Sequence, residues 1–354
     1  MKLQRFALWL FVVIATGWLM IVGRNLILPI VLAIVFWYLI NTLAVTLGKI
    51  SWGGWHLPRS VALPIAILAI GGLFWLLGSM ISSNIAQVIK AAPAYQARLE
   101  AIIIDVSLKL GFENAPNLSE LFRSFDLGRT LQELGGAAAS VAGSIGIVII
   151  YTLFLLAEQA TFSAKIEAVF HDKPREAQAR RLLDHIAEDI QIYIRIKTLL
   201  ALITAAIGYA IMASVGVDFA GFWAVLIFFF YYIPTIGSLL AIVSPTLLTL
   251  VQFDSIQPFI IVAVCMGVVQ ISMANFIEPM IMGRSLNVSP FIIILSLMVF
   301  GTMWGVVGMF LCVPIMVIAM IVLANFPQTR PLAAIISADG KLLLPEHREA
   351  KRKA

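Results

Sequence analysis

One acidic residue, Glu278, lies inside an apolar run of this chain, whereas the other charged residues lie at the termini, in polar segments or at the ends of apolar runs. Within a membrane an ionisable side chain costs about 3 kcal/mol or more, so its presence there indicates function by default. Pro279 follows it and has no backbone N–H, which leaves the carbonyl of Asn275 without its helical partner. The Glu278 carboxylate, the Asn275 side-chain amide and the freed Asn275 carbonyl could together bind a polar solute or a cation, or exchange a proton.

Two more polar residues, Gln270 and Ser272, have a helical spacing relative to Glu278. Gln270 lies on a nearby face of the same expected helix. Arg284 follows Glu278 by six residues and gives a structural alternative, in which the acid forms a bridge to it or reaches interfacial water near the helix end. The functional and the structural interpretation of Glu278 both stay open at this point.

Helix-breaking residues cluster around this acid. Pro234, Thr235 and Gly237 form a Pro-Thr-Ile-Gly turn signal, and Ser289 followed by Pro290 is typical of an N-cap with proline at the first helical position. Further candidate hinges or helix breaks are Pro245, Gly301, Gly305 and Pro314. Such residues are common in membrane helices, so their concentration over 230–314 is what favours a functional interpretation.

The composition indicates a membrane protein. Hydrophobic residues make up 61% of the 354 residues and charged residues 12%, against about 45–50% and about 25% in soluble domains. Apolar runs of at least about 18 residues predict membrane spans. The candidate segments are 6–23, 26–48, 60–81, 138–157, 198–216, 219–250, 258–282 and 290–325. We therefore predict an all-α integral membrane protein with about eight membrane segments.

Two of these segments are too long to be simple spans. At about 1.5 Å per residue, 219–250 would reach roughly 48 Å and 290–325 roughly 54 Å, against a hydrocarbon core about 30 Å thick. Both carry breakers near their middle, at 234–237 and 301–305. We therefore predict two re-entrant helical hairpins, a feature typical of transporter binding sites.

Charge predicts the orientation. The segment 158–197 and the tail 326–354 are rich in Lys and Arg, as cytoplasmic segments are, so both termini are expected inside the cell. The expected order is spans at 1–81, an extracytoplasmic amphipathic helical segment at 82–137, a span at 138–157, a cytoplasmic amphipathic helical segment at 158–197, a transport core at 198–325 and the tail at 326–354. Apolar residues at spacings of three and four support the helical assignment of 82–110.

Several function classes find no support in the residues. The chain lacks GxSxG, HExxH and phosphate-loop motifs, so we expect no enzyme activity, no cofactor and no ATP-driven pump. The four His lie outside the apolar runs, and the two Cys form no CxxC pair, so no metal site is expected. The basic residues are spread over loops and termini, which argues against nucleic-acid binding.

The C-terminal third resembles the autoinducer-2 exporter (AI-2E) family. The resemblance rests on Tyr232–Ser238 followed by Pro245, on Asn275–Arg284, and on Gly301–Trp304 with Val307–Met309 leading to Pro314. Weaker matches at Leu28–Pro29 and Tyr193–Thr198 extend it over most of the chain, nearest to the quorum-signal exporter branch. It implies a multi-pass transporter of the bacterial inner membrane, in a family whose substrates differ and whose members include sodium–proton antiporters.

The leading hypothesis is secondary transport of a small polar solute such as autoinducer-2, outward, with proton coupling through Glu278. Its path would be lined by Glu278, Asn275 and the Pro234–Gly237 turn. The alternatives are a monovalent cation/proton antiporter and a non-transporting membrane scaffold. The partners expected are the solute or cation, protons, the lipid bilayer and further copies of the same chain.

Overall fold

The computed structural model describes residues 2–49, 51–52, 55–109, 145–170, 172–282 and 287–340. These residues are almost entirely helical, which confirms the predicted fold class. The exception is a short antiparallel pair of strands, β1 (Ser51–Trp52) and β2 (Trp55–His56), together with an isolated bridge. Helices predominate because a helix satisfies its backbone hydrogen bonds internally, as an apolar surrounding requires.

The helices follow one another with short connections. The first part of the chain contains α1 (Lys2–Val22), α2 (Arg24–Gly48) and α3 (Arg59–Lys109). A helix over 145–158 continues into η1 (Gln159–Thr161) and α6 (Phe162–Val169), and α7 (Lys173–Val215) follows. The remainder consists of α8 (Ala220–Phe230), α9 (Ile236–Gln252), α10 (Gln257–Ser272), η2 (Met273–Ile277), α11 (Glu278–Met282), α12 (Pro290–Asn325) and α13 (Arg330–Ile336).

Six helices of the described residues are long and apolar enough to cross a membrane. They are Arg24–Gly48, Arg59–Ile81, Ile145–Val169, Lys173–Val215, Gln257–Ile281 and Pro290–Asn325. α8 and α9 are apolar but shorter, and α1, which covers the predicted first span, is not among the six. The chain is thus a multi-pass helical membrane protein, while the count of eight membrane segments stays a prediction.

The predicted break in 219–250 is present. α8 ends at Phe230, α9 begins at Ile236, and the two helices pack against each other. Their far ends are joined by the Gln252 side chain, whose Nε2 donates to the Gly216 carbonyl at 2.8 Å and whose Oε1 accepts from the Asp218 N–H at 2.8 Å. α8 and α9 therefore form a helical hairpin, here called the first hairpin. Its placement as a re-entrant element in the bilayer stays a prediction.

The break in 290–325 lies at Gly305, which has φ 63° and ψ −144° within the otherwise helical α12. Val288 and Ser337 form an antiparallel bridge, and the Ser289 N–H donates to the Ile336 carbonyl at 2.8 Å. The start of α12 is therefore tied to the end of α13, and the chain returns to where α12 began.

Three of the other predicted breakers do not interrupt their helices. Pro245 lies inside α9, Pro314 lies inside α12, and Gly301 is helical and close to the Met309 side chain. A proline is tolerated inside such helices because neighbouring groups can satisfy the carbonyl that it frees. Each break is instead followed within three residues by a glycine, Gly237 or Gly308, that lies against the backbone of the preceding helix. In Ser289–Pro290 the proline is the first helical residue as predicted, but the Ser289 hydroxyl makes no capping bond.

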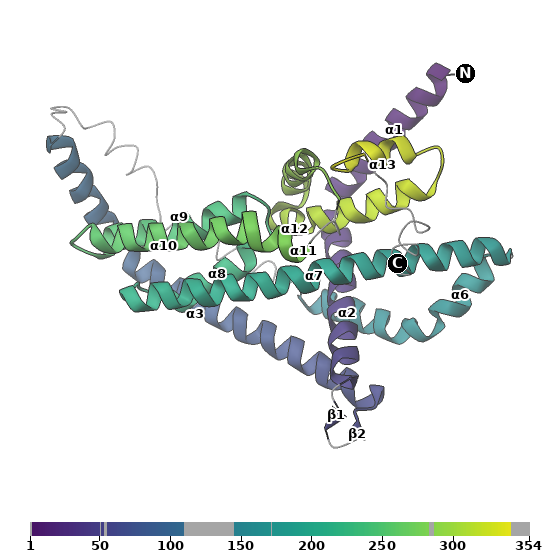
Figure 1. Cartoon of the computed structure of the whole chain (residues 1–354), viewed down its shortest axis with the longest axis horizontal. Helices are drawn as coiled ribbons and strands as arrows, with labels where there is room; N and C mark the ends of the chain where they lie inside the picture. The colour runs from purple at the N-terminus through teal and green to yellow at the C-terminus, as the bar shows by residue number, and fades with distance from the viewer. Residues whose placement is uncertain are drawn as a thin grey trace.

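Two helices run well beyond a bilayer thickness. α3 has 51 residues, which confirms that the third span continues as a helix up to Lys109. That this continuation lies outside the cell stays a prediction, and the expected return through 117–135 lies outside the described residues. α7 has 43 residues and joins the amphipathic segment ending at 197 to the following span without a break. In Figure 1, α7 runs across the molecule, with α9 and α10 extending in a similar direction and α2 crossing at a steep angle.

The part of α3 that follows Ile81, here called its outer part, contacts the base of the first hairpin, which is the end opposite the tip. The Tyr95 hydroxyl donates to Asp218 at 2.8 Å, and Arg98 donates to the Gln252 carbonyl at 3.1 Å and pairs with Asp254. The loops before α8 and after α9 therefore lie at the same end of the molecule as this part of α3.

Candidate functional site

A buried ion pair joins α7 to the start of α11. Lys197 Nζ lies 2.5 Å from Glu278 Oε1, and the two side chains are 10% and 22% exposed. Partners in a low-dielectric setting are strongly coupled, and removing one of them typically costs about 3–5 kcal/mol. The acid predicted to be unusual thus has a fixed cationic partner, and this partner is Lys197. Arg284, the partner weighed from sequence, lies outside the described residues.

The tip of the first hairpin is attached to this pair. The buried Tyr231 donates its hydroxyl to Glu278 Oε2 at 3.1 Å, and the Lys197 ammonium lies 4.9 Å from the centre of its ring. The hydroxyls of Tyr232 and Thr198 are 2.6 Å apart. Thr198 directs its own proton to the Ile194 carbonyl, so Tyr232 is the donor. The tip is therefore held to α7 and α11 by polar contacts.

The turn that forms this tip is strained. Thr235 has φ 58° and ψ −61°, a conformation that is a genuine outlier for a β-branched residue. Its hydroxyl donates to the Pro234 carbonyl and its carbonyl accepts from the Ser238 hydroxyl, both at 2.7 Å. The carbonyl of Phe230, four residues before Pro234, accepts from the Ile233 N–H at 2.9 Å. Strain of this kind is concentrated at functional sites.

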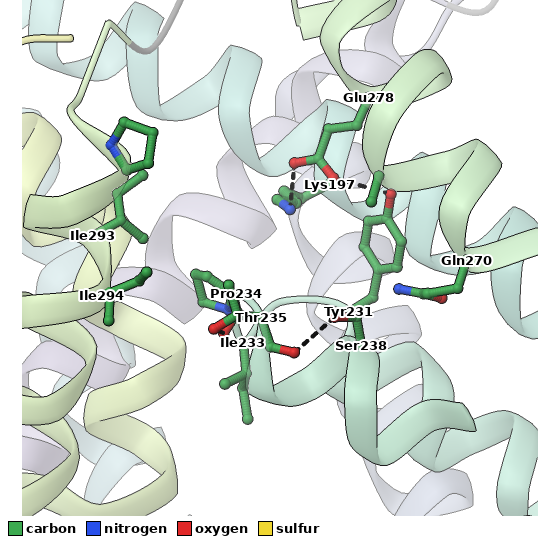
Figure 2. Close-up of a pocket in the computed structure, with 12 residues that line it drawn as sticks. Lys197, Tyr231, Ile233, Pro234, Thr235, Ser238, Gln270, Glu278, Ile293 and Ile294 are labelled. Atoms are coloured by element: carbon green, nitrogen blue, oxygen red, sulfur yellow. Dashed lines mark hydrogen bonds and ion pairs between the residues drawn. The ribbon is translucent and has the colours of Figure 1, made fainter. Parts of the chain in front are cut away.

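A cavity of about 370 Å³ lies beside the ion pair, a size within the range of small-molecule sites. Figure 2 shows the tip residues Pro234 and Thr235 facing Ile293 and Ile294 of α12, with Glu278, Lys197 and Tyr231 grouped to one side. The lining combines these residues with Ile233, Ser238, Gln270, Ala274 and Pro290. It is mostly apolar with a few polar groups, as binding sites for small molecules are.

The Gln270 side chain lines this cavity, but its oxygen is enclosed by protein. The residue is 7% exposed, and within the described residues its Oε1 has no hydrogen-bond partner. A buried polar atom without a partner is unfavourable by about 1–3 kcal/mol.

A π-helical turn leads into Glu278. The five residues of η2 (Met273–Ile277) are wound more widely than the α-helix on either side, a local irregularity that often occurs at functional sites. The turn lies immediately before Pro279, where the helix lacks a backbone donor.

The structure brings some of the predicted site residues together and leaves others apart. Glu278, Gln270, Pro234 and Thr235 line the cavity, and Gly237 lies one turn along from the tip. Asn275 is exposed, donates to the Ile271 carbonyl at 3.1 Å and does not line the cavity. Pro279 and Ser289 are likewise outside the lining, although each is next to a residue within it.

Lys197 is the residue of the candidate site that sequence reasoning missed, because it was counted among the charges of a cytoplasmic segment. A signal was present. The buried residues of α7 include five that recur at spacings of three and four: Asp189, Tyr193, Lys197, Leu200 and Thr204. The stripe passes through Lys197, so a lysine on the packed face of a helix could have been recognised as a partner for a buried acid.

The site offers no arrangement for a multivalent metal. Within the described ranges, no group of three or more His, Cys, Asp and Glu side chains could hold a metal ion. The polar groups at the cavity are instead one carboxylate, one ammonium, hydroxyls and an amide, which suit hydrogen bonding and proton exchange.

Comparison with known proteins agrees with this architecture. The family model for AI-2E family transporters matches residues 8–328. The chain is 27% identical to the AI-2 transport protein TqsA of Escherichia coli, with 92% of this chain and 95% of that protein aligned. It is 28% identical to a putative transport protein of Haemophilus influenzae (79% and 82% aligned) and 29% identical to one of Borreliella burgdorferi (76% and 74%). The chain is a member of the AI-2E transporter family.

Proposed function

We propose that this protein is a secondary transporter that moves a small polar solute through the cavity at the tip of the first hairpin. The observation that carries the proposal is the buried Lys197–Glu278 pair, linked to the tip through Tyr231 and bordering a cavity of about 370 Å³. The E. coli relative is named for AI-2 transport, so autoinducer-2 is the first cargo to test, with export from the bacterial inner membrane as the expected direction.

The contacts of the tip support an alternating-access mechanism. Tyr231 and Tyr232 connect the hairpin to Glu278 and Thr198, so loss of these bonds would allow the tip to move relative to α7 and α11. Such rocking of a broken-helix element about a central site is the general scheme of secondary transporters. The cavity would then open to alternate sides as the tip moves.

Glu278 is the proposed coupling residue. A proton on its carboxylate would cancel the negative charge that holds both Lys197 and the Tyr231 hydroxyl. The same proton would weaken the attachment of the tip, so proton binding and hairpin movement would be linked. Inward proton flow could in this way drive outward solute movement.

The test is transport by purified protein in proteoliposomes, with and without a pH gradient, using autoinducer-2 and a panel of small polar solutes. Glu278→Gln removes the charge at nearly constant volume and should lower gradient-driven transport by at least about tenfold, the change expected when a buried pair worth more than about 1.4 kcal/mol is lost. The matched control is Glu188→Gln, the same change at an exposed position of α7, which should transport as wild type does.

Wild-type transport by Glu278→Gln under a pH gradient would remove Glu278 from the coupling role. A proton flux driven by sodium or potassium without any organic solute would favour the cation/proton antiport alternative. Absence of any flux, together with a cavity that labelling reagents cannot reach from either side, would favour the scaffold alternative.

A further inference from the structure

We propose that Lys197 is a tethered counter-ion that occupies the cation position at Glu278, so that the cavity accepts neutral hydrogen-bonding solutes and excludes sodium and potassium ions. The proposal rests on the proposed function in taking the cavity as the transport site. Its central observation is the 2.5 Å contact between Lys197 Nζ and Glu278 Oε1, made by two side chains that are largely buried.

The oxygen atoms around this cavity would otherwise suit a monovalent cation. Glu278 supplies a carboxylate, Gln270 an unpartnered amide oxygen and Ser238 a hydroxyl, and all three residues line the same space. Hard cations select oxygen ligands of these kinds. With an ammonium already against the carboxylate, the site is neutral as a whole, and a second cation would meet the charge of Lys197.

The surroundings of Lys197 also hold its ammonium group in place beside Glu278. Its ammonium lies over the Tyr231 ring at 4.9 Å, and Tyr231 in turn donates to the second oxygen of Glu278 at 3.1 Å. A cation that displaced it would leave a positive charge unpaired in a buried position, which is strongly unfavourable. Both carboxylate oxygens are therefore occupied by groups of the protein itself.

What remains available to a ligand is uncharged. The Ser238 hydroxyl, whose proton goes to the Thr235 carbonyl, can still accept, and Gln270 adds an uncharged amide to the lining. A solute with hydroxyl or N–H donors can bind here without adding charge. The cavity is accordingly matched to a neutral donor, and Lys197 is the residue that determines this specificity.

The experiment measures the thermal stability of purified full-length protein in sodium, potassium and choline chloride at equal ionic strength. Lys197→Met removes the ammonium while keeping an unbranched side chain of similar length, and Lys173→Met is the matched control at an exposed position. The double variant Lys197→Met/Glu278→Gln removes the charge that a cation would neutralise.

Wild type and Lys173→Met should melt at the same temperature in the three salts. Lys197→Met should melt lower in choline and recover by roughly 2–4 °C or more in sodium or potassium, because a bound cation stabilises the folded state. The double variant should lose this recovery. Radioactive sodium should bind saturably to Lys197→Met and not to wild type.

Saturable sodium or potassium binding by wild type that is abolished by Glu278→Gln would overturn the proposal, since a cation would then reach the acid with lysine in place. So would a Lys197→Met protein that melts equally in all three salts. If Lys197→Met cannot be obtained folded in any salt, no cation replaces the lysine, and this also counts against the proposal. None of these readouts depends on transport, so failure of the proposed function is detected separately by the liposome assay.

Discussion

The tip of the first hairpin depends on a glycine at position 237, and its replacement by alanine gives a sharp test of the fold. A Cβ atom added at Gly237 would lie 1.8 Å from the Phe230 carbonyl oxygen and 2.8 Å from its carbon. Carbon–oxygen contacts are normally about 3.3 Å or longer, so the two arms would have to separate by roughly 1.5 Å. Because the obstacle is backbone, no side-chain rotation can relieve it.

We expect Gly237→Ala to destabilise the protein by about 3 kcal/mol or more, at or above the upper end of typical overpacking costs. This corresponds to a fall in melting temperature of roughly 6–12 °C at about 2–4 °C per kcal/mol. The assay is the fraction of protein that remains monodisperse in detergent after heating. Gly308→Ala should behave alike, because its Cβ would lie 1.9 Å from the Phe300 carbonyl oxygen.

The matched control is Gly267→Ala in α10, where no atom lies within 4 Å of the added Cβ. A helical glycine replaced by alanine without a clash should be neutral or stabilising by up to about 1 kcal/mol. Equal melting temperatures for Gly237→Ala and Gly267→Ala would refute the close approach of Gly237 to Phe230, and with it the geometry assigned to the tip.

Two further predictions concern the break in α12 and the outer part of α3. Gly305→Ala should lower stability by about 1–3 kcal/mol relative to Gly267→Ala, because φ 63° with ψ −144° is accessible essentially to glycine alone; equal thermal unfolding of the two variants would contradict this. Burial, followed by the hydrogen bond to Asp218 and the charge of that residue, raises the pKa of Tyr95 to about 12 from its ordinary value of 10.0. The protonated phenol is therefore favoured by folding, and the stability it contributes is present below pH 10.0 and lost as the pH rises towards about 12. Tyr95→Phe should reduce this loss, measured by chemical denaturation across that window, and an unchanged profile would exclude Tyr95 as its source.

The breaks and the long helices could be predicted because their signals are local. An apolar run that exceeds the bilayer and contains Pro234 or Gly305 cannot be one straight span, and the periodicity after residue 81 indicated that α3 continues. The position of each break was less certain from sequence. Pro245 and Gly301 resemble Pro234 and Gly305 as residue types. Only the latter two are followed within three residues by a glycine, Gly237 or Gly308, that lies against the backbone of the preceding helix.

The charge pairing at the site could not be predicted in the same way. Glu278 was identified from its surroundings in the chain, and local reasoning then offered only Arg284, six residues away, as a structural partner. The observed partner, Lys197, is separated by the whole of the first hairpin and by α10, so it becomes adjacent only when these helices pack. The orphaned oxygen of Gln270 is equally a consequence of packing, since it depends on what surrounds the side chain.

The first hairpin is fixed more firmly at its base than at its tip, and this limits how it can move in the proposed mechanism. At the base, Gln252 spans both arms, and α3 adds the Arg98 and Tyr95 contacts to the same loops. At the tip, the polar attachments to the rest of the described chain run through Tyr231 and Tyr232, and the first depends on the charge of Glu278. Gly237 also lies so close to the Phe230 carbonyl that α8 and α9 cannot slide past each other at the tip. The movement that costs least is therefore a pivot of the intact hairpin about its base, with the Glu278 charge controlling release of the tip.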